Sequence, residues 1–75
     1  MLAYILVSLL ECDEQEVIKA LSKNKEIKEA HILFGEWDLI IQIETDTPET
    51  AGKFVMEKIR SLDDVEMTST LIVAK

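Results

Sequence analysis

The 75-residue sequence has few of the residues that usually cross-link a small domain. It contains one cysteine, Cys12, which excludes an internal disulfide. One histidine and one cysteine are too few for a zinc site, and the acidic residues lack the spacing of a calcium-binding loop. We therefore expect no metal and no organic cofactor. A chain this short buries only a modest share of its surface, so self-association is the expected source of further stability.

Basic residues are scarce as well. Fifteen acidic and eight basic residues give a net charge of −7, and there is a single arginine. A surface of this sign repels nucleic acids and anionic membranes, so we expect neither as a direct partner. No apolar stretch reaches the length of about 18 residues that a membrane-spanning helix needs. The apolar start of the chain has no basic segment and no small-residue cleavage site of a signal peptide, which predicts a cytoplasmic protein.

The hydrophobic pattern predicts a single domain, residues 1–75, with strands and helices in the order βαββαβ. The expected strands are residues 2–10, 27–34, 39–44 and 65–74. This order predicts a ferredoxin-like α+β sandwich, in which a four-stranded antiparallel sheet carries two helices on one face. In such a sheet the first and third strands are central, and the second and fourth lie at opposite edges.

Both predicted helices have clear start signals. The first is expected over residues 14–23, after Asp13 as the N-cap, and Asn24 is suited to a left-handed stop. The second begins at Thr47-Pro48, where Thr serves as N-cap and Pro takes the first helical position. Its apolar residues recur at helical spacing up to about Leu62, and they form one stripe.

Both faces of the predicted sheet carry apolar residues. In the first strand Ile5 and Val7 point to one side, and Tyr4 and Leu6 point to the other. Two helices can cover only one face, and a solvated face would show polar alternation. We therefore expect the sheet of a second subunit to cover the open face, which gives a dimeric α+β barrel. The alternative is a monomer with an unusually apolar surface.

His31 and Cys12 are the candidates for catalytic chemistry. His31 is predicted in mid-strand on the same side as Ile27 and Leu33, where it is either a proton shuttle in a cavity above the sheet or an ordinary, partly buried strand residue. No nucleophile is predicted beside it, which favours the ordinary role. Cys12 lies near a helix start, but the acids around it favour an inert thiol.

The segment FGEWD, residues 34–38, holds one of two glycines and the only tryptophan. Gly35 suits a hairpin turn with a positive φ, and it also lets a ligand approach the backbone N–H groups closely. Trp37 either packs over such a turn or lines a site. Asp38 could accept hydrogen bonds from an ammonium group. These residues alone leave the turn and the binding loop equally open.

A second polar cluster lies at the start of the last strand, in the segment MTST. Its hydroxyls belong to Thr68, Ser69 and Thr70. Threonine is a good strand former, and hydroxyls can also bind a carboxylate. Strand adjacency does not place this cluster beside FGEWD. Assembly between subunits could bring the two segments together, or the hydroxyls could belong to an interface.

Together, GEWDLIIQIET and EKIRSLDDVEMTSTLIV resemble the effector domain, or RAM domain, of the Lrp/AsnC family of transcriptional regulators over nearly the whole chain. The resemblance implies dimers through sheet contacts, octamers as tetramers of dimers, and a free amino acid bound between dimers. The residues that match the ligand loop and the hydroxyl cluster are Gly35, Glu36, Trp37, Asp38, Thr68, Ser69 and Thr70. The resemblance implies that loop N–H groups and hydroxyls hold the α-carboxylate and that Asp38 holds the α-amino group. His31 is a further candidate for the pocket wall.

The expected function is therefore an amino-acid-binding regulatory module and not an enzyme. Because the chain begins directly at the first strand, we expect no helix-turn-helix, and hetero-assembly with full-length Lrp-type regulators is an expected mode of action. The alternative is a cofactor-free dimeric barrel enzyme of the monooxygenase or isomerase type. It would use His31, with Tyr4 or Trp37, in a cavity between helices and sheet. A third possibility is a structural partner that binds only another protein chain.

Overall fold

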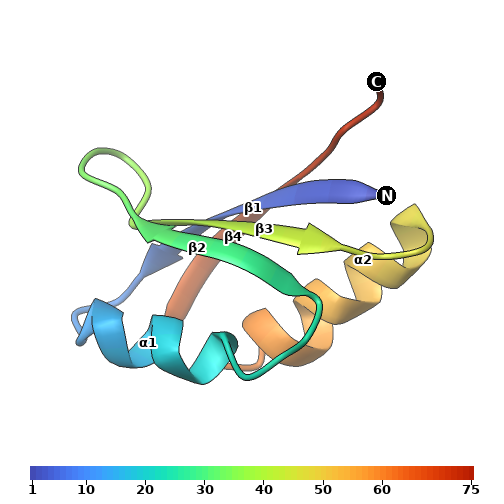
Figure 1. Ribbon diagram of the computed structural model, residues 1–75. Helices are drawn as coiled ribbons and strands as arrows, with labels where there is room; N and C mark the ends of the chain where they lie inside the picture. The colour runs from blue at the N-terminus through green and yellow to red at the C-terminus, as the bar shows by residue number, and fades with distance from the viewer.

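The computed structural model describes all residues 1–75 and consists of a sheet with two helices packed on one face (Figure 1). The elements are β1 (Leu2–Leu9), α1 (Glu14–Leu21), β2 (Ile27–Ile32), β3 (Leu39–Glu44), α2 (Pro48–Phe54) and β4 (Val65–Ile72), and α2 continues directly into a π-helical turn, η1 (Val55–Ile59). The predicted βαββαβ order and the ferredoxin-like fold are confirmed. Neither helix has the length and apolar composition of a membrane-spanning segment.

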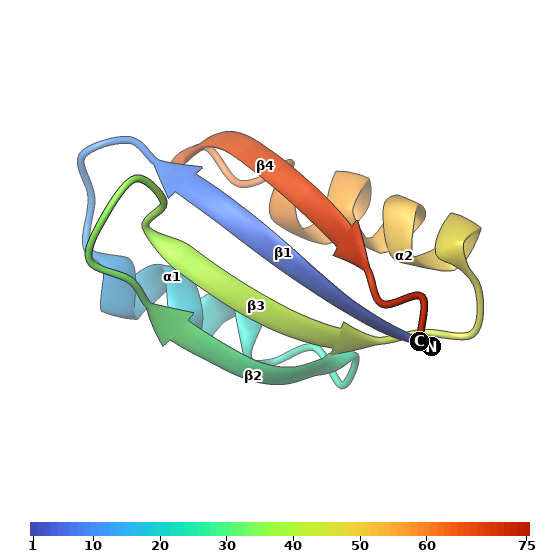
Figure 2. The same ribbon diagram turned by 90° about the horizontal axis from the view of Figure 1, so that it is seen from above.

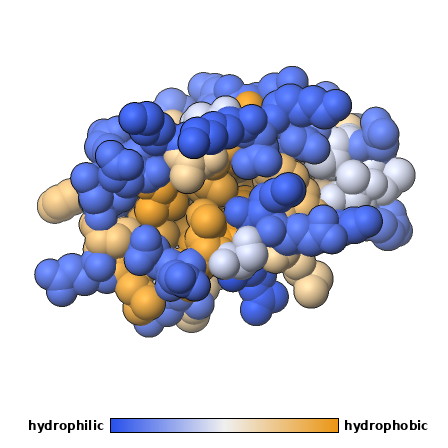
Figure 3. Space-filling view, turned by 90° about the horizontal axis from the view of Figure 1, so that it is seen from below, coloured by the Kyte–Doolittle hydropathy of each residue, from blue (hydrophilic) through white to orange (hydrophobic).

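The sheet is antiparallel with the strand order β2-β3-β1-β4, so β1 and β3 are central as predicted (Figure 2). Alternate residues of these two strands face the helices and are fully buried: Ala3, Ile5, Val7, Leu39, Ile41 and Ile43. The core is completed by buried residues of α1 and of the second helical segment, which is α2 together with η1: Val17, Leu21, Ala51, Phe54, Val55 and Ile59. Hydrophobic surface remains visible between the two helices, with hydrophilic side chains around it (Figure 3).

Both predicted helix starts are confirmed by hydrogen bonds. The Asp13 carboxylate accepts from the Gln15 N–H at 3.0 Å, and Oγ1 of Thr47 accepts from the Thr50 N–H at 3.1 Å. The predicted left-handed stop at Asn24 is wrong, because no residue has a positive φ. Asn24 instead donates its backbone and side-chain N–H groups to the Leu21 carbonyl, both at 3.0 Å, which satisfies the end of α1 at Leu21.

The predicted face of Ile27 is also wrong. The pairing of β2 with β3 shifts its register between Ile27 and Glu29. Such an irregularity breaks strand alternation. Ile27 consequently packs against the core, whereas His31 pairs with Ile40 on the open face of the sheet. β2 ends at Ile32, short of the predicted residue 34.

The open face of the sheet is partly apolar, as predicted. Tyr4, Leu6 and Ile40 are half-buried on its central strands, and Met67 and Leu71 of β4 are 56% and 50% exposed. These residues lie on the side that neither helix covers. A second subunit on this face stays a prediction.

Candidate functional site

Asp38 anchors the loop between β2 and β3 to the end of β1. Its Oδ2 accepts a hydrogen bond from the Leu9 N–H at 2.7 Å, and its own N–H donates to the Val7 carbonyl at 2.9 Å. Its carbonyl accepts from the Leu33 N–H at 2.8 Å. Asp38 therefore has a structural role in a single subunit, and its Oδ1 is the oxygen that remains without a partner in the chain.

Gly35 and Glu36 form the exposed tip of this loop. The expectation that Gly35 adopts a positive φ is wrong, because no glycine does so. A Cβ atom placed on Gly35 would meet nothing within 4 Å. The fold thus does not require glycine here, and the loop backbone stays open to an approaching molecule.

Trp37 extends from this loop to the start of β4. It lines a hollow of about 350 Å³ whose other walls are Arg60, Val65, Glu66, Met67 and Thr68. β1 lies between β3 and β4, so strand adjacency does not bring the loop and β4 together, as predicted. They meet because the loop and the start of β4 lie at the same end of the sheet (Figure 2). A single subunit therefore brings Trp37 and Thr68 to one hollow.

The three hydroxyls of the MTST segment do not form one cluster. Thr68 and Thr70 pair with Val7 and Ile5, so they lie on the helix side of the sheet. Ser69 pairs with Leu6 and therefore lies on the open face. Strand alternation separates the serine from the two threonines.

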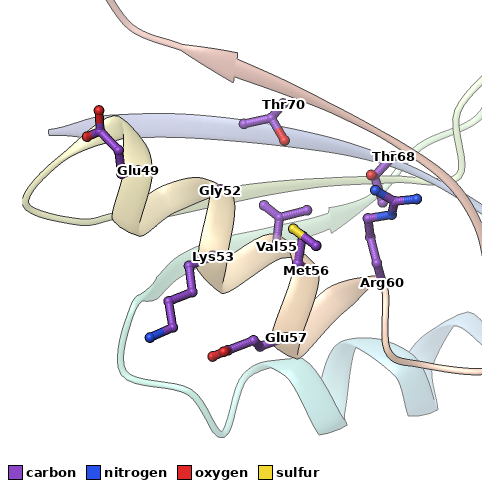
Figure 4. A pocket seen from close by; sticks show the side chains of 9 residues that line it. All are labelled: Glu49, Gly52, Lys53, Val55, Met56, Glu57, Arg60, Thr68 and Thr70. Atoms are coloured by element: carbon purple, nitrogen blue, oxygen red, sulfur yellow. The ribbon is translucent and has the colours of Figure 1, made fainter.

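A larger groove, of about 710 Å³, runs between β4 and the second helical segment (Figure 4). It is lined by Glu49, Gly52, Lys53, Val55, Met56, Glu57, Arg60, Thr68 and Thr70. Arg60 and Thr68 also line the hollow of Trp37, so the two spaces adjoin. We call this groove and the adjoining hollow the α2–β4 groove.

Arg60 and the residues of α2 that line the groove were not predicted from the sequence. A signal existed, because Arg60 is the only arginine in the chain. It has no carboxylate within 4.0 Å, since the one salt bridge in the structure joins His31 and Glu29. On a helix, however, a lone arginine is also typical of a solvated surface.

His31 lies apart from this groove. Its Nε2 is 3.3 Å from Oε1 of Glu29, and the two side chains are 63% and 58% exposed. With Tyr4, Ile40 and Gln42 they line a hollow of about 120 Å³ on the open face. The expectation that His31 lies in a cavity between helices and sheet is therefore wrong, because β2 directs this side chain away from the helices.

Cys12 lies in a strongly acidic environment. Desolvation raises the pKa of its thiol, and the negative charges of Asp64, Glu14, Asp13 and Asp38 raise it further. A raised pKa lowers the thiolate fraction, and the thiolate is the reactive form. No group of three or more His, Cys, Asp or Glu residues is placed to hold a metal ion.

Comparison with known proteins identifies the family of this domain. Residues 2–75 match the family model described as the Lrp/AsnC ligand binding domain. The HTH-type transcriptional regulator FL11 of Pyrococcus horikoshii is 37% identical over 75 residues, which are 100% of this chain and 49% of that protein. The chain spans less than half the length of the curated relatives that it matches.

Solved structures agree. The crystal structure of FFRP-DM1 is 42% identical with a TM-score of 0.89, and the match covers 96% of each chain. A transcriptional regulator from Neisseria meningitidis in complex with L-Met shares the fold with a TM-score of 0.88 at 22% identity, over 99% of this chain and 49% of that one. The chain therefore belongs to the family of Lrp/AsnC ligand-binding domains, to which its loop and threonine-rich strand pointed.

Proposed function

We propose that the domain binds a free amino acid in the α2–β4 groove and acts as a regulatory module, not as an enzyme. The observation that carries the proposal is the hollow that Trp37 and Thr68 line together, which adjoins the larger groove. Carboxylate and guanidinium groups both occur on its walls, at Glu49 and Arg60, which suits a zwitterion. The L-Met complex of a protein with the same fold and the transcriptional regulators among its relatives support this reading.

The matched residues divide into two groups in this proposal. The hydroxyls of Thr68 and Thr70, which line the groove, donate to the carboxylate. Gly35, Glu36 and Asp38 line neither the groove nor the adjoining hollow, although Trp37 of the same loop does. Asp38 has one carboxylate oxygen available for an ammonium group that reaches beyond the hollow, because Leu9 occupies only Oδ2. Ser69 and His31 lie on the open face of the sheet and line neither the groove nor the adjoining hollow, so this proposal gives them no contact with the amino acid.

We further propose that this domain acts without a DNA-binding domain of its own, through assembly with full-length regulators of the family. Its net charge of −7 supports this mode, because it disfavours direct contact with DNA phosphates. The open apolar face supports dimers, and octamers would be tetramers of such dimers. A labelled domain that never joins assemblies of a full-length relative such as FL11 in sedimentation experiments would contradict this mode.

The alternative of a cofactor-free enzyme has no comparable support. His31 lies in a hollow of about 120 Å³, and its ring is hydrogen-bonded to the exposed carboxylate of Glu29. Tyr4, which this alternative also names, lines that hollow beside His31, whereas Trp37 does not. The small volume of the hollow and the exposure of His31 and Glu29 argue against a reaction at this position.

Thermal unfolding in the presence of each of the twenty amino acids, at about 5 mM, tests the proposal. A ligand present at about 100 times its Kd stabilises the folded state by about 2.7 kcal/mol, which raises the Tm of a domain this small by about 10–20 °C. We expect one or a few amino acids to give such a shift. If none of the twenty changes the Tm, the proposed function is wrong.

Two matched variants locate the site. Thr68→Val keeps the shape and strand preference of the side chain but removes the hydroxyl, so it should weaken binding by about 10- to 100-fold. Ser69→Ala removes the neighbouring hydroxyl on the opposite face, and it should leave the Tm shift unchanged. Equal effects of the two variants would place the site elsewhere.

A further inference from the structure

We propose that Arg60 is the residue that recognises the α-carboxylate of the amino acid, an inference that rests on the proposed function. Arg60 and Thr68 are the two residues that line both the groove and the adjoining hollow. Figure 4 shows the guanidinium group of Arg60 beside Thr68. A guanidinium fork and a hydroxyl together match the oxygens of a carboxylate.

The guanidinium group of Arg60 is free to bind an anion. Its side chain forms no salt bridge, although Glu57 and Glu66 also line these spaces. Lys53 and Glu57 extend away from the two threonines, whereas Arg60 points toward them (Figure 4). Arg60 is thus the cation that faces the threonine hydroxyls.

The π-helical turn supplies a second, independent observation. The Arg60 N–H donates to the Val55 carbonyl at 2.8 Å, five residues earlier, instead of to Met56 as in an α-helix. The π-turn lies directly before Arg60, within the stretch of helix that lines the groove at Val55, Met56 and Glu57.

π-Turns are rare within α-helices and are frequently found at functional sites. Gly52 also lines the groove, and it carries no side chain that would occupy this space. The placement of the side chains thus directs one unpaired cation to the threonine hydroxyls.

The test compares amino acids with their carboxamides. Each of the twenty L-amino acids is titrated into the wild-type domain by calorimetry, and every one that binds is compared with its primary amide, which lacks the negative charge. We expect the wild type to bind the acid about 10- to 100-fold more tightly than the amide, as for a hydrogen bond to a charged group. Arg60→Gln should lose about that factor for the acid and should no longer distinguish acid from amide.

Two further variants control the interpretation. Lys58→Gln removes the same charge from the same helical segment outside the groove, so its Kd values should match those of the wild type. Arg60→Lys keeps the charge without the fork and should fall between wild type and Arg60→Gln. If Arg60→Gln binds and discriminates like the wild type, the role of Arg60 is refuted while amino-acid binding stands. If no amino acid binds the wild type, the proposed function fails, and this inference fails with it.

Discussion

Replacement of Asp38 by alanine should destabilise the domain even when no amino acid is present. The variant removes the acceptor of the Leu9 N–H, a bond of 2.7 Å at the end of β1. Hydrogen bonds to charged groups contribute about 1.5–3 kcal/mol. This bond is only partly buried, so water can replace the lost acceptor in part, and we take the lower end of about 1.5–2 kcal/mol. In a domain of this size, that loss lowers the Tm by about 6–16 °C.

Two matched variants sharpen this prediction in urea unfolding experiments. Asp38→Asn keeps an acceptor oxygen without the charge, and it should lose about half as much stability or less. Glu36→Ala removes a neighbouring exposed carboxylate that accepts no hydrogen bond, and its effect should stay within about 0.5 kcal/mol. If Asp38→Ala is as stable as the wild type, the anchoring role of Asp38 is refuted.

This structural role has a consequence for binding experiments. An Asp38→Ala variant that fails to bind amino acids does not by itself identify a ligand contact, because the loop loses its anchor as well. Asp38→Asn separates the two roles. It retains an acceptor for the Leu9 N–H and lacks the charge that would hold an ammonium group.

Three further predictions concern other parts of the molecule. Asp13→Ala removes the cap of α1 and should cost about 1 kcal/mol in chemical denaturation, and a loss below about 0.3 kcal/mol would argue against the cap. The raised pKa of Cys12 should make its alkylation by iodoacetamide at pH 8 slower than in the urea-unfolded chain, with a rate that rises toward higher pH; equal rates would show an unperturbed thiol. Leu6→Glu places a charge on the open face and should convert a dimer to monomers in analytical ultracentrifugation, and an unchanged assembly would place the interface elsewhere.

The elements set by local chemistry were predictable from the sequence. The alternation of Ile5 with Val7 and of Ile41 with Ile43 requires only the period of a strand against a covered face. The caps Asp13 and Thr47 depend on side chains that bond to the backbone within the next three residues. These local rules fixed the order of the elements and therefore the fold.

The errors came from features that depend on contacts distant in sequence. The irregularity beside Ile27 arises from pairing with β3, so simple alternation put that residue on the face of His31. Strand alternation places Ser69 and the two threonines on opposite faces of β4. Only the pairing of β4 with β1 shows that the threonines are on the face that the helices cover. The groove combines residues of α2, η1 and β4 that are distant in the sequence, and no local pattern marked the π-turn within it.

The central claim is that an amino acid binds beside Trp37 and Thr68, and fluorescence of Trp37 tests it most directly. The chain has one tryptophan, so the emission reports on this hollow alone. We predict that an amino acid found in the thermal scan changes the emission with a saturable dependence on concentration. The change should persist in Ser69→Ala and should require about 10- to 100-fold more amino acid in Thr68→Val. Binding seen by calorimetry that leaves the emission of Trp37 unchanged, or that is equally tight in Thr68→Val, would contradict the account.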